Sequence, residues 1–155
     1  MLIKSALFGE QNIDPESIIS FPAGIPGFDN CIRFKLFHEE RKSGIIYWLQ
    51  SLDDSEVVFS VADPAHFHIH YEFTLSDEET ALLEIENDSS DLLVLLMLHK
   101  DAVHDLNAPP TIKGSLKWPL IVNLRSRKGL QKILRDFEQT VTLRENRNVI
   151  DVTAS

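Results

Sequence analysis

Residues 92–98 read Leu-Leu-Val-Leu-Leu-Met-Leu, the longest apolar run in the chain. The run is much shorter than the ~18 residues that a membrane-spanning helix needs. Its length is typical of a strand that is covered on both faces or lies at the centre of a sheet. A strand this apolar would promote aggregation on an open edge, so the run favours a sheet that closes on itself.

The segments on either side of this run also have the character of strands. Residues 33–37 and 70–75 alternate polar with apolar side chains, which places one face on a core and the other in water. The predicted strands are short, rich in β-branched and aromatic residues, and mostly bounded by Gly, Pro, Asp, Asn or Ser. They are Ile18–Phe21, Ile32–Phe37, Ile45–Leu52, Val57–Ala62, Ile69–Leu75, Leu92–His99, Leu116–Leu124, Leu130–Leu134 and Val141–Leu143.

Two places have helical character. Ser76-Asp-Glu-Glu79 has the spacing of a capping box and predicts a helix of one to three turns. Lys128–Phe137 has apolar residues at helical spacing, but Ser126-Arg-Lys-Gly129 has the composition of a hairpin turn, so we predict a strand there. The sequence therefore predicts an all-β, mainly antiparallel fold: a small closed or partly open β-barrel with one or two short helices.

Length and composition are those of one globular domain. The chain has 155 residues, of which 43% are hydrophobic and 25% charged. We predict a single domain over residues 1–144 and a flexible tail over 145–155. The only cysteine, Cys31, has no internal disulfide partner, and residues 1–10 lack the features of a signal peptide. We therefore expect a cytoplasmic protein that does not insert into a membrane.

The charge is strongly acidic, with 24 Asp and Glu against 15 Lys and Arg and a formal net charge of −9. Such a field repels phosphate backbones and disfavours direct nucleic-acid binding, whereas it attracts a basic protein partner. One short stretch is locally basic, and its ordinary interpretation is a solvated hairpin: Arg125, Arg127, Lys128, Lys132 and Arg135.

The motifs of nucleotide, metal and hydrolytic sites are absent from the sequence, so we expect no enzyme, no catalytic residue and no cofactor. Asp53-Asp54 follows a predicted strand and could form a pair of carboxylates, but a solvated turn explains it equally well. The alternative function is a metal- or small-ligand-binding barrel, because His66, His68 and His70 share one face of a strand. We nevertheless predict no native metal site, since no carboxylate or cysteine supports the cluster.

Three segments, in order and in register, resemble the family of flagellar assembly factors called FliW. Ile19-Ser-Phe-Pro-Ala-Gly-Ile-Pro-Gly-Phe28 is similar to that family's N-terminal signature. Trp48-Leu-Gln-Ser51 and Val57-Val-Phe-Ser-Val-Ala-Asp-Pro64 follow. Trp118-Pro-Leu-Ile-Val-Asn123 then continues to Arg127-Lys-Gly-Leu-Gln-Lys-Ile-Leu134. Residues 115–119 depart from the family pattern, and the tail after Arg144 matches nothing in it.

The resemblance implies a small antiparallel barrel that works as a regulator by binding proteins. FliW proteins bind the translational regulator CsrA and relieve its repression of flagellin translation, and flagellin competes for FliW. This is exchange of one protein between two partners by mass action. A third possibility is a structural barrel that binds neither partner.

Candidate partner-binding residues are aromatic or polar side chains within these segments. Phe28 ends a loop that its prolines and glycines make rigid, so this loop loses little entropy on binding. Trp118 precedes a proline that cannot donate to a sheet, which suggests an exposed edge. The polar candidates could equally satisfy buried hydrogen bonds. The full set of candidates is Phe28, Gln50, Lys117, Trp118, Asn123 and Gln131.

Overall fold

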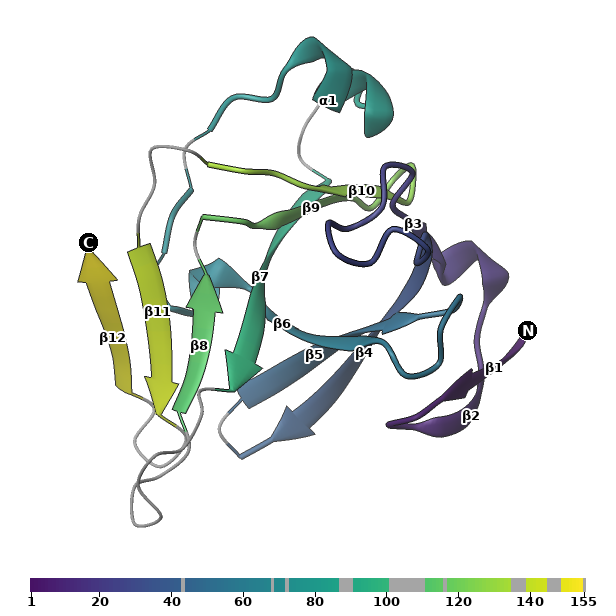
Figure 1. Cartoon of the computed structure of the whole chain (residues 1–155), viewed down its shortest axis with the longest axis horizontal. Coiled ribbons are helices and arrows are strands. Elements are labelled where there is room, and N and C mark those ends of the chain that lie inside the picture. Colours follow the sequence, from purple (N-terminus) through teal and green to yellow (C-terminus); the bar gives the residue numbers. More distant parts are fainter. Residues whose placement is uncertain are drawn as a thin grey trace.

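The structure is a computed structural model of the chain, and it describes residues 1–42, 44–67, 69–71, 73–86, 91–100, 111–115, 117–134, 139–144 and 149–154. Most of its regular elements are strands (Figure 1). The strands are β1 Leu2–Ser5, β2 Gly9–Asn12, β3 Ile19–Ser20, β4 Arg33–Arg41, β5 Gly44–Ser51, β6 Val58–Ala62, β7 Leu92–Lys100, β8 Thr111–Ser115, β9 Leu120–Asn123, β10 Lys128–Gln131, β11 Gln139–Arg144 and β12 Val149–Ala154. The helices are η1 Pro15–Ser17, η2 Pro64–Phe67 and α1 Asp77–Leu82.

Seven strands form a closed barrel, which Figure 1 views through its ring. The order around the ring is β7, β6, β5, β4, β3, β10, β9, and the β7–β9 pairing returns to the start. Every pairing is antiparallel except β3 with β10, which is parallel and is recorded at a single pair, Ser20 with Lys128. The all-β barrel predicted from the sequence is confirmed. The central position predicted for residues 92–98 is also confirmed, since β7 pairs with β6, β8 and β9.

The sheet extends beyond the barrel on one side. The last residues of β7 pair with β8, β8 pairs with β11, and β11 pairs with β12 (Figure 1). The sequence prediction missed β8 and β12. It also placed residues 145–155 in a flexible tail, whereas the structure pairs Val149–Ala154 with β11 in an antiparallel hairpin. β12 lies at the sheet edge and has only one neighbouring strand.

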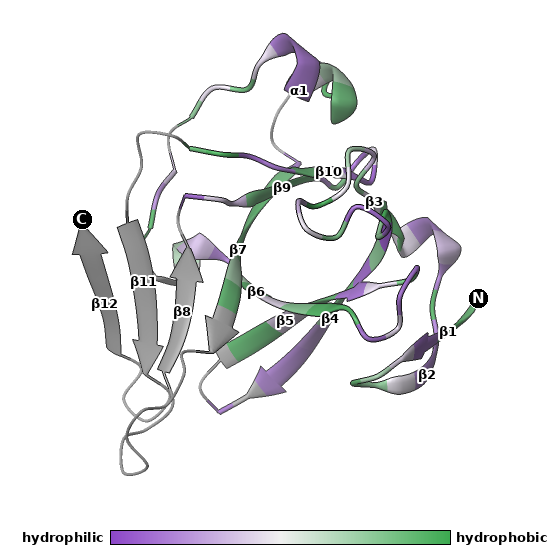
Figure 2. Ribbon diagram, viewed as in Figure 1, coloured by the Kyte–Doolittle hydropathy of each residue, from purple (hydrophilic) through white to green (hydrophobic). Residues whose placement is uncertain are grey.

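The interior of the barrel is apolar (Figure 2). Phe21, Phe34 and Leu49 have no exposed surface and belong to one buried cluster. The ring centroids of Phe21 and Phe34 lie 5.3 Å apart in an edge-on arrangement. A second cluster, built on Leu83, Ile121 and Leu130, fills the space between the outer surface of β9–β10 and the segment that carries α1.

The barrel closes where β3 meets β10, and a glycine makes this contact possible. A Cβ atom at Gly129 would lie 2.7 Å from Cζ of Phe21. The Phe21 ring is fully buried and has no free space to move into. The glycine therefore allows the aromatic ring to pack directly on the backbone of β10.

Of two hairpins in the structure, the sequence predicted one and missed the other. The hairpin predicted around Ser126–Gly129 is confirmed, with β9 and β10 antiparallel and the turn at residues 124–127. The helical alternative for Lys128–Phe137 is wrong over its described part, which contains β10. The β1–β2 hairpin was not predicted. It is a separate two-stranded sheet, and Gly9, the first residue of β2 after the turn, has a φ of 72°.

Residues 69–75 were predicted to form a strand, and this is wrong for the residues described there, which carry no strand pairing. Their alternation has another cause: Phe73 and Leu75 pack onto the second core cluster, and Tyr71 contacts the Phe73 ring. The helix predicted after Ser76 is confirmed. The Ser76 Oγ accepts a bond from the backbone N–H of Glu79, and the Glu79 carboxylate accepts one from the N–H of Ser76. No helix in the described ranges is long and apolar enough to cross a membrane.

Candidate functional site

The six candidate residues divide into two buried amides and four residues with solvent contact. Gln50 has no exposed surface and Asn123 is 5% exposed. Phe28 is 39% exposed and Trp118 is 41% exposed, whereas Lys117 and Gln131 are half-buried. This division decides which candidates are able to contact a partner.

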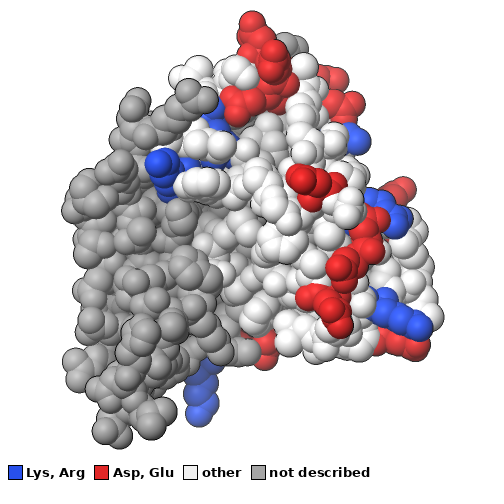
Figure 3. Space-filling model, in the orientation of Figure 1, with Lys and Arg blue, Asp and Glu red and all other residues white. Residues whose placement is uncertain are grey.

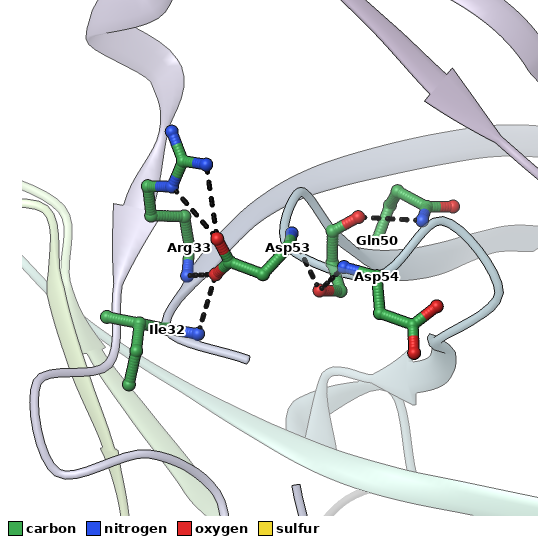
Figure 4. Close-up of polar contacts among 6 residues, drawn as sticks. Ile32, Arg33, Gln50, Asp53 and Asp54 are labelled. Carbon is green, nitrogen blue, oxygen red and sulfur yellow. Dashed lines mark hydrogen bonds and ion pairs between the residues drawn. The ribbon is translucent and has the colours of Figure 1, made fainter. Parts of the chain in front are cut away.

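Gln50 lies in β5 and connects two neighbouring segments (Figure 4). Its Oε1 accepts a 2.6 Å hydrogen bond from the Ser5 hydroxyl of β1. Its Nε2 donates to the carbonyls of Ser51, Ser55 and Val57 at 2.8, 3.2 and 3.4 Å. All of the Gln50 side chain is buried and its amide bonds lie within the fold, so its contact with a partner stays a prediction. The residue attaches the N-terminal hairpin to the 52–57 turn.

Asn123 performs a similar task at the end of β9. Its Nδ2 donates to the carbonyl of Leu83 at 2.9 Å, and its Oδ1 accepts the backbone N–H of Arg125 at 3.0 Å. The Ser126 hydroxyl donates to the same Leu83 carbonyl at 2.7 Å. Asn123 therefore fixes the end of the α1 segment onto the β9–β10 turn. Its amide is used within the fold, and its contact with a partner stays a prediction.

Asp53 has a structural role, whereas the sequence offered only a solvated turn as the explanation of this position. One carboxylate oxygen accepts the backbone N–H groups of Ile32 and Arg33, both at 2.8 Å, and the other accepts the Arg33 guanidinium at 3.1 Å (Figure 4). Partial burial opposes ionisation, but the backbone and side-chain bonds and the charge of Arg33 outweigh it and lower the pKa of Asp53. The carboxylate thus joins the start of β4 to the β5–β6 turn.

Trp118 and Ile133 form an exposed apolar pair beyond the end of the β9–β10 ladder. The Lys132 N–H donates to Pro119 at 2.9 Å, and the Leu134 N–H donates to Lys117 at 2.8 Å. These bonds continue the register of the ladder and set Ile133 opposite Trp118, in a pair whose side chains approach closely. Ile133 is 50% exposed. We call Trp118, Ile133, Gln131 and Lys117 the tryptophan lip.

Gln131 links this lip to the barrel. Its Nε2 donates to the Trp118 carbonyl at 3.3 Å and contacts the Met97 sulfur at 3.4 Å. On the other face of the same strand, Lys132 pairs with Glu79 of α1 at 2.8 Å. Burial opposes ionisation of Glu79, but bonds from Lys132 and Ser76 and the Lys132 charge lower its pKa. The structure therefore brings Trp118 and Gln131 together at the end of the ladder, and Lys117 precedes Trp118 in the chain, opposite Leu134.

Phe28 lies in a different place, at the end of the loop that follows β3. Its ring meets Phe59 of β6 edge-on, with centroids 4.9 Å apart. Within the described residues, Phe28 makes no hydrogen bond or ring contact with the tryptophan lip, so the two exposed aromatics belong to separate surfaces. Both were found from sequence as aromatics beside proline or glycine. Ile133 was missed, because its exposure depends on a strand register that composition does not show.

The described residues offer little chemistry beyond binding. No group of three or more His, Cys, Asp or Glu among them is placed to hold a metal ion. His68 of the histidine cluster lies outside the described residues, so the metal-binding alternative stays untested.

The buried indole N–H of Trp48 has no acceptor in the described part of the chain, and its ring packs on Phe8 with centroids 6.3 Å apart.

Comparisons with known proteins agree with the barrel and with the sequence segments. The model of the family described as FliW protein matches residues 2–146. The flagellar assembly factor FliW of Azoarcus sp. (strain BH72) is 39% identical over 145 residues, which cover 94% of this chain and 99% of the relative. That of Chromobacterium violaceum is 40% identical over 136 residues, covering 85% and 92%. A crystal structure of the flagellar assembly factor FliW matches with a TM-score of 0.74 at 26% identity, covering 93% of this chain and 96% of that one. The chain therefore belongs to the FliW family of flagellar assembly factors.

Proposed function

We propose that this protein is a non-enzymatic regulator that acts in the cytoplasm by binding two proteins in competition. One is CsrA, whose repression of flagellin translation it relieves, and the other is flagellin, which displaces CsrA. Membership in a family of flagellar assembly factors is the observation that carries this proposal. It limits the process to flagellum assembly and leaves the partners to be tested.

The distribution of exposed side chains supports a protein-binding role. Phe28 and Trp118 are large aromatic side chains that keep about two-fifths of their surface in solvent, at 39% and 41%. Each stands on a fixed backbone, one in a loop closed by hydrogen bonds and one on the continued β9–β10 ladder. Rigid, exposed aromatics are the typical anchors of protein interfaces because they bury a large area at little cost in conformational entropy.

The charge of the molecule supports a basic partner over a nucleic acid. A formal charge of −9 raises the rate of encounter with a cationic protein and opposes phosphate backbones. An RNA-binding regulator such as CsrA carries basic surface, so its capture by an acidic protein is electrostatically favourable. Flagellin then needs to compete for the protein through apolar contacts or through part of the same charged surface.

Calorimetric titration tests the proposal directly. The protein is titrated with purified CsrA and, separately, with purified flagellin, at about 50 mM and about 300 mM salt, because screening weakens exposed charge pairs over this range. We expect saturable binding to both partners, weaker CsrA binding at high salt, and displacement of CsrA when flagellin is added. Absence of heat and of co-elution with both partners would show that the proposal is wrong.

A further inference from the structure

The loop between β3 and β4 has an apolar outer face that the core does not use. We call residues 22–28 the proline loop. Ile25 within the loop and Phe21 just before it turn inward and are buried in the core of the barrel. Pro22, Ala23, Pro26 and Phe28 are exposed. The loop therefore divides its side chains between anchoring in the barrel and display to solvent.

This display is held in one conformation. The N–H groups of Gly24, Phe28 and Cys31 donate to the carbonyls of Phe21, Ile25 and Phe28 at 2.8, 2.7 and 2.9 Å. Gly24 and Gly27 adopt φ values of 74° and 88°, which other residues rarely adopt. The Phe28 ring is fixed from below by Phe59. A partner that binds here does not have to order the loop first.

Several carboxylates lie on one side of the proline loop. The β5–β6 turn is bonded to the residues that follow the loop: Asp53 accepts the N–H groups of Ile32 and Arg33, and the Leu52 N–H donates to the Arg33 carbonyl at 2.8 Å. Besides Asp53, which is paired with Arg33, the exposed carboxylates of these two segments are Asp29, Asp54 and Glu56. The one cation among them, Arg33, is paired with Asp53. Figure 3 shows acidic groups, with basic groups among them, bordering uncharged surface on one side of the molecule.

We propose that the proline loop and its acidic rim dock a cationic segment of a partner protein. Lysine or arginine side chains of that segment pair with Asp29, Asp54 and Glu56, while their aliphatic stems or an apolar neighbour cover Phe28. An exposed aromatic ring attracts such cations as well. This inference rests on the proposed function, in that it assigns the surface on which the basic partner CsrA is held. Phosphate-bearing ligands are repelled by the same rim.

The test uses two variants of the full-length protein and one matched control. The first variant, Asp29→Asn with Asp54→Asn and Glu56→Gln, removes three rim charges. The second, Phe28→Ala, removes the ring. The control, Glu10→Gln with Glu40→Gln and Glu78→Gln, removes three exposed charges on β2, β4 and α1 and so changes net charge equally. Each is titrated with purified CsrA at about 50 mM and about 500 mM salt, after thermal melting confirms folding.

We expect the rim variant and Phe28→Ala each to weaken CsrA binding about tenfold at low salt, and the control to weaken it less than about threefold. The difference between rim variant and wild type should shrink at high salt, whereas that of Phe28→Ala should persist. If wild type binds but the rim variant stays within about twofold of it, or the control loses as much, this docking surface is wrong while the proposed function stands. If wild-type protein itself does not bind CsrA, the proposed function fails first.

Discussion

The Gln50 side chain bonds to the turn that joins β5 to β6, and the proline loop lies near the same turn. The exposure of Gln50, and that of Phe28 in the loop, is in each case the reverse of what the polarity of the side chain suggests. Gln50, a polar residue, is completely buried, and its amide bonds hold β1 and the turn in place. Phe28, an apolar residue, keeps 39% of its surface exposed on a loop held by backbone bonds. In this barrel the buried amides maintain the structure, and the exposed aromatics are the groups available to a partner.

Gln50→Ala tests this contrast and is the substitution from which we expect the largest effect on stability. The change leaves the Ser5 hydroxyl and three backbone carbonyls without their amide partner and opens a cavity, so we expect a loss of about 3 kcal/mol in the free energy of unfolding. Urea denaturation measures the loss. The protein that remains folded should bind CsrA with unchanged affinity. A stable variant with weakened binding would return Gln50 to the set of partner contacts.

Asn123→Ala should have a smaller effect of the same kind. The variant loses the amide bond to the Leu83 carbonyl, but the Ser126 hydroxyl still bonds that carbonyl at 2.7 Å. We therefore expect a loss of about 1.5 kcal/mol in the free energy of unfolding. The double variant with Ser126→Ala should lose more than the sum of the single changes, because the carbonyl then has no donor. Simple additivity in urea denaturation would contradict a shared role.

Acid should release the clamp made by Asp53. Its pKa is lowered in the folded protein, so the carboxylate contributes stability above its ordinary value near 3.8, and this stability disappears as pH falls through the folded value. Because the side chain is partly exposed, we expect only about 1 kcal/mol. The stability of Asp53→Asn should vary less with pH below about pH 4.5 than that of wild type. Identical pH profiles would show that the clamp does not contribute.

Ile133→Thr should change stability least. Ile133 is half-exposed on the tryptophan lip, and threonine keeps the β-branched shape that suits an extended strand. We expect a change within about 0.5 kcal/mol. A loss above about 1.5 kcal/mol in the same denaturation assay would mean that the lip packs against part of the fold and is not a free surface.

The sequence predicted those elements whose signals are local. The capping box at Ser76 and Glu79 needs only four residues, and the β9–β10 hairpin needs only a turn between two apolar segments. The strand predicted over residues 69–75 failed, because alternation records one buried face and does not distinguish a sheet from an extended segment packed on a core. β1 and β2 were missed because each has only four residues and the two form a small sheet of their own.

The candidate site was predictable only as a set of residue types. Composition identified Phe28 and Trp118 as aromatics beside proline or glycine, and the structure exposes both. It could not separate Gln50 and Asn123 from Gln131, because burial of an amide depends on partners far away in sequence, such as Ser5 for Gln50 and Leu83 for Asn123. The acidic rim also depends on a long-range contact, between Asp53 and the N–H groups of Ile32 and Arg33.

The two strand pairings that close the barrel can form only late as the chain is synthesised. The ribosome makes the chain from its N-terminus, and β9 and β10, which close the ring against β7 and β3, are complete only at residue 131 of 155. Until then β3 lacks its β10 neighbour, and the apolar β7 lacks β9 along one edge. The nascent chain therefore has its most aggregation-prone strand before it has the strand that covers it, and it acquires the finished barrel only once residue 131 has been made.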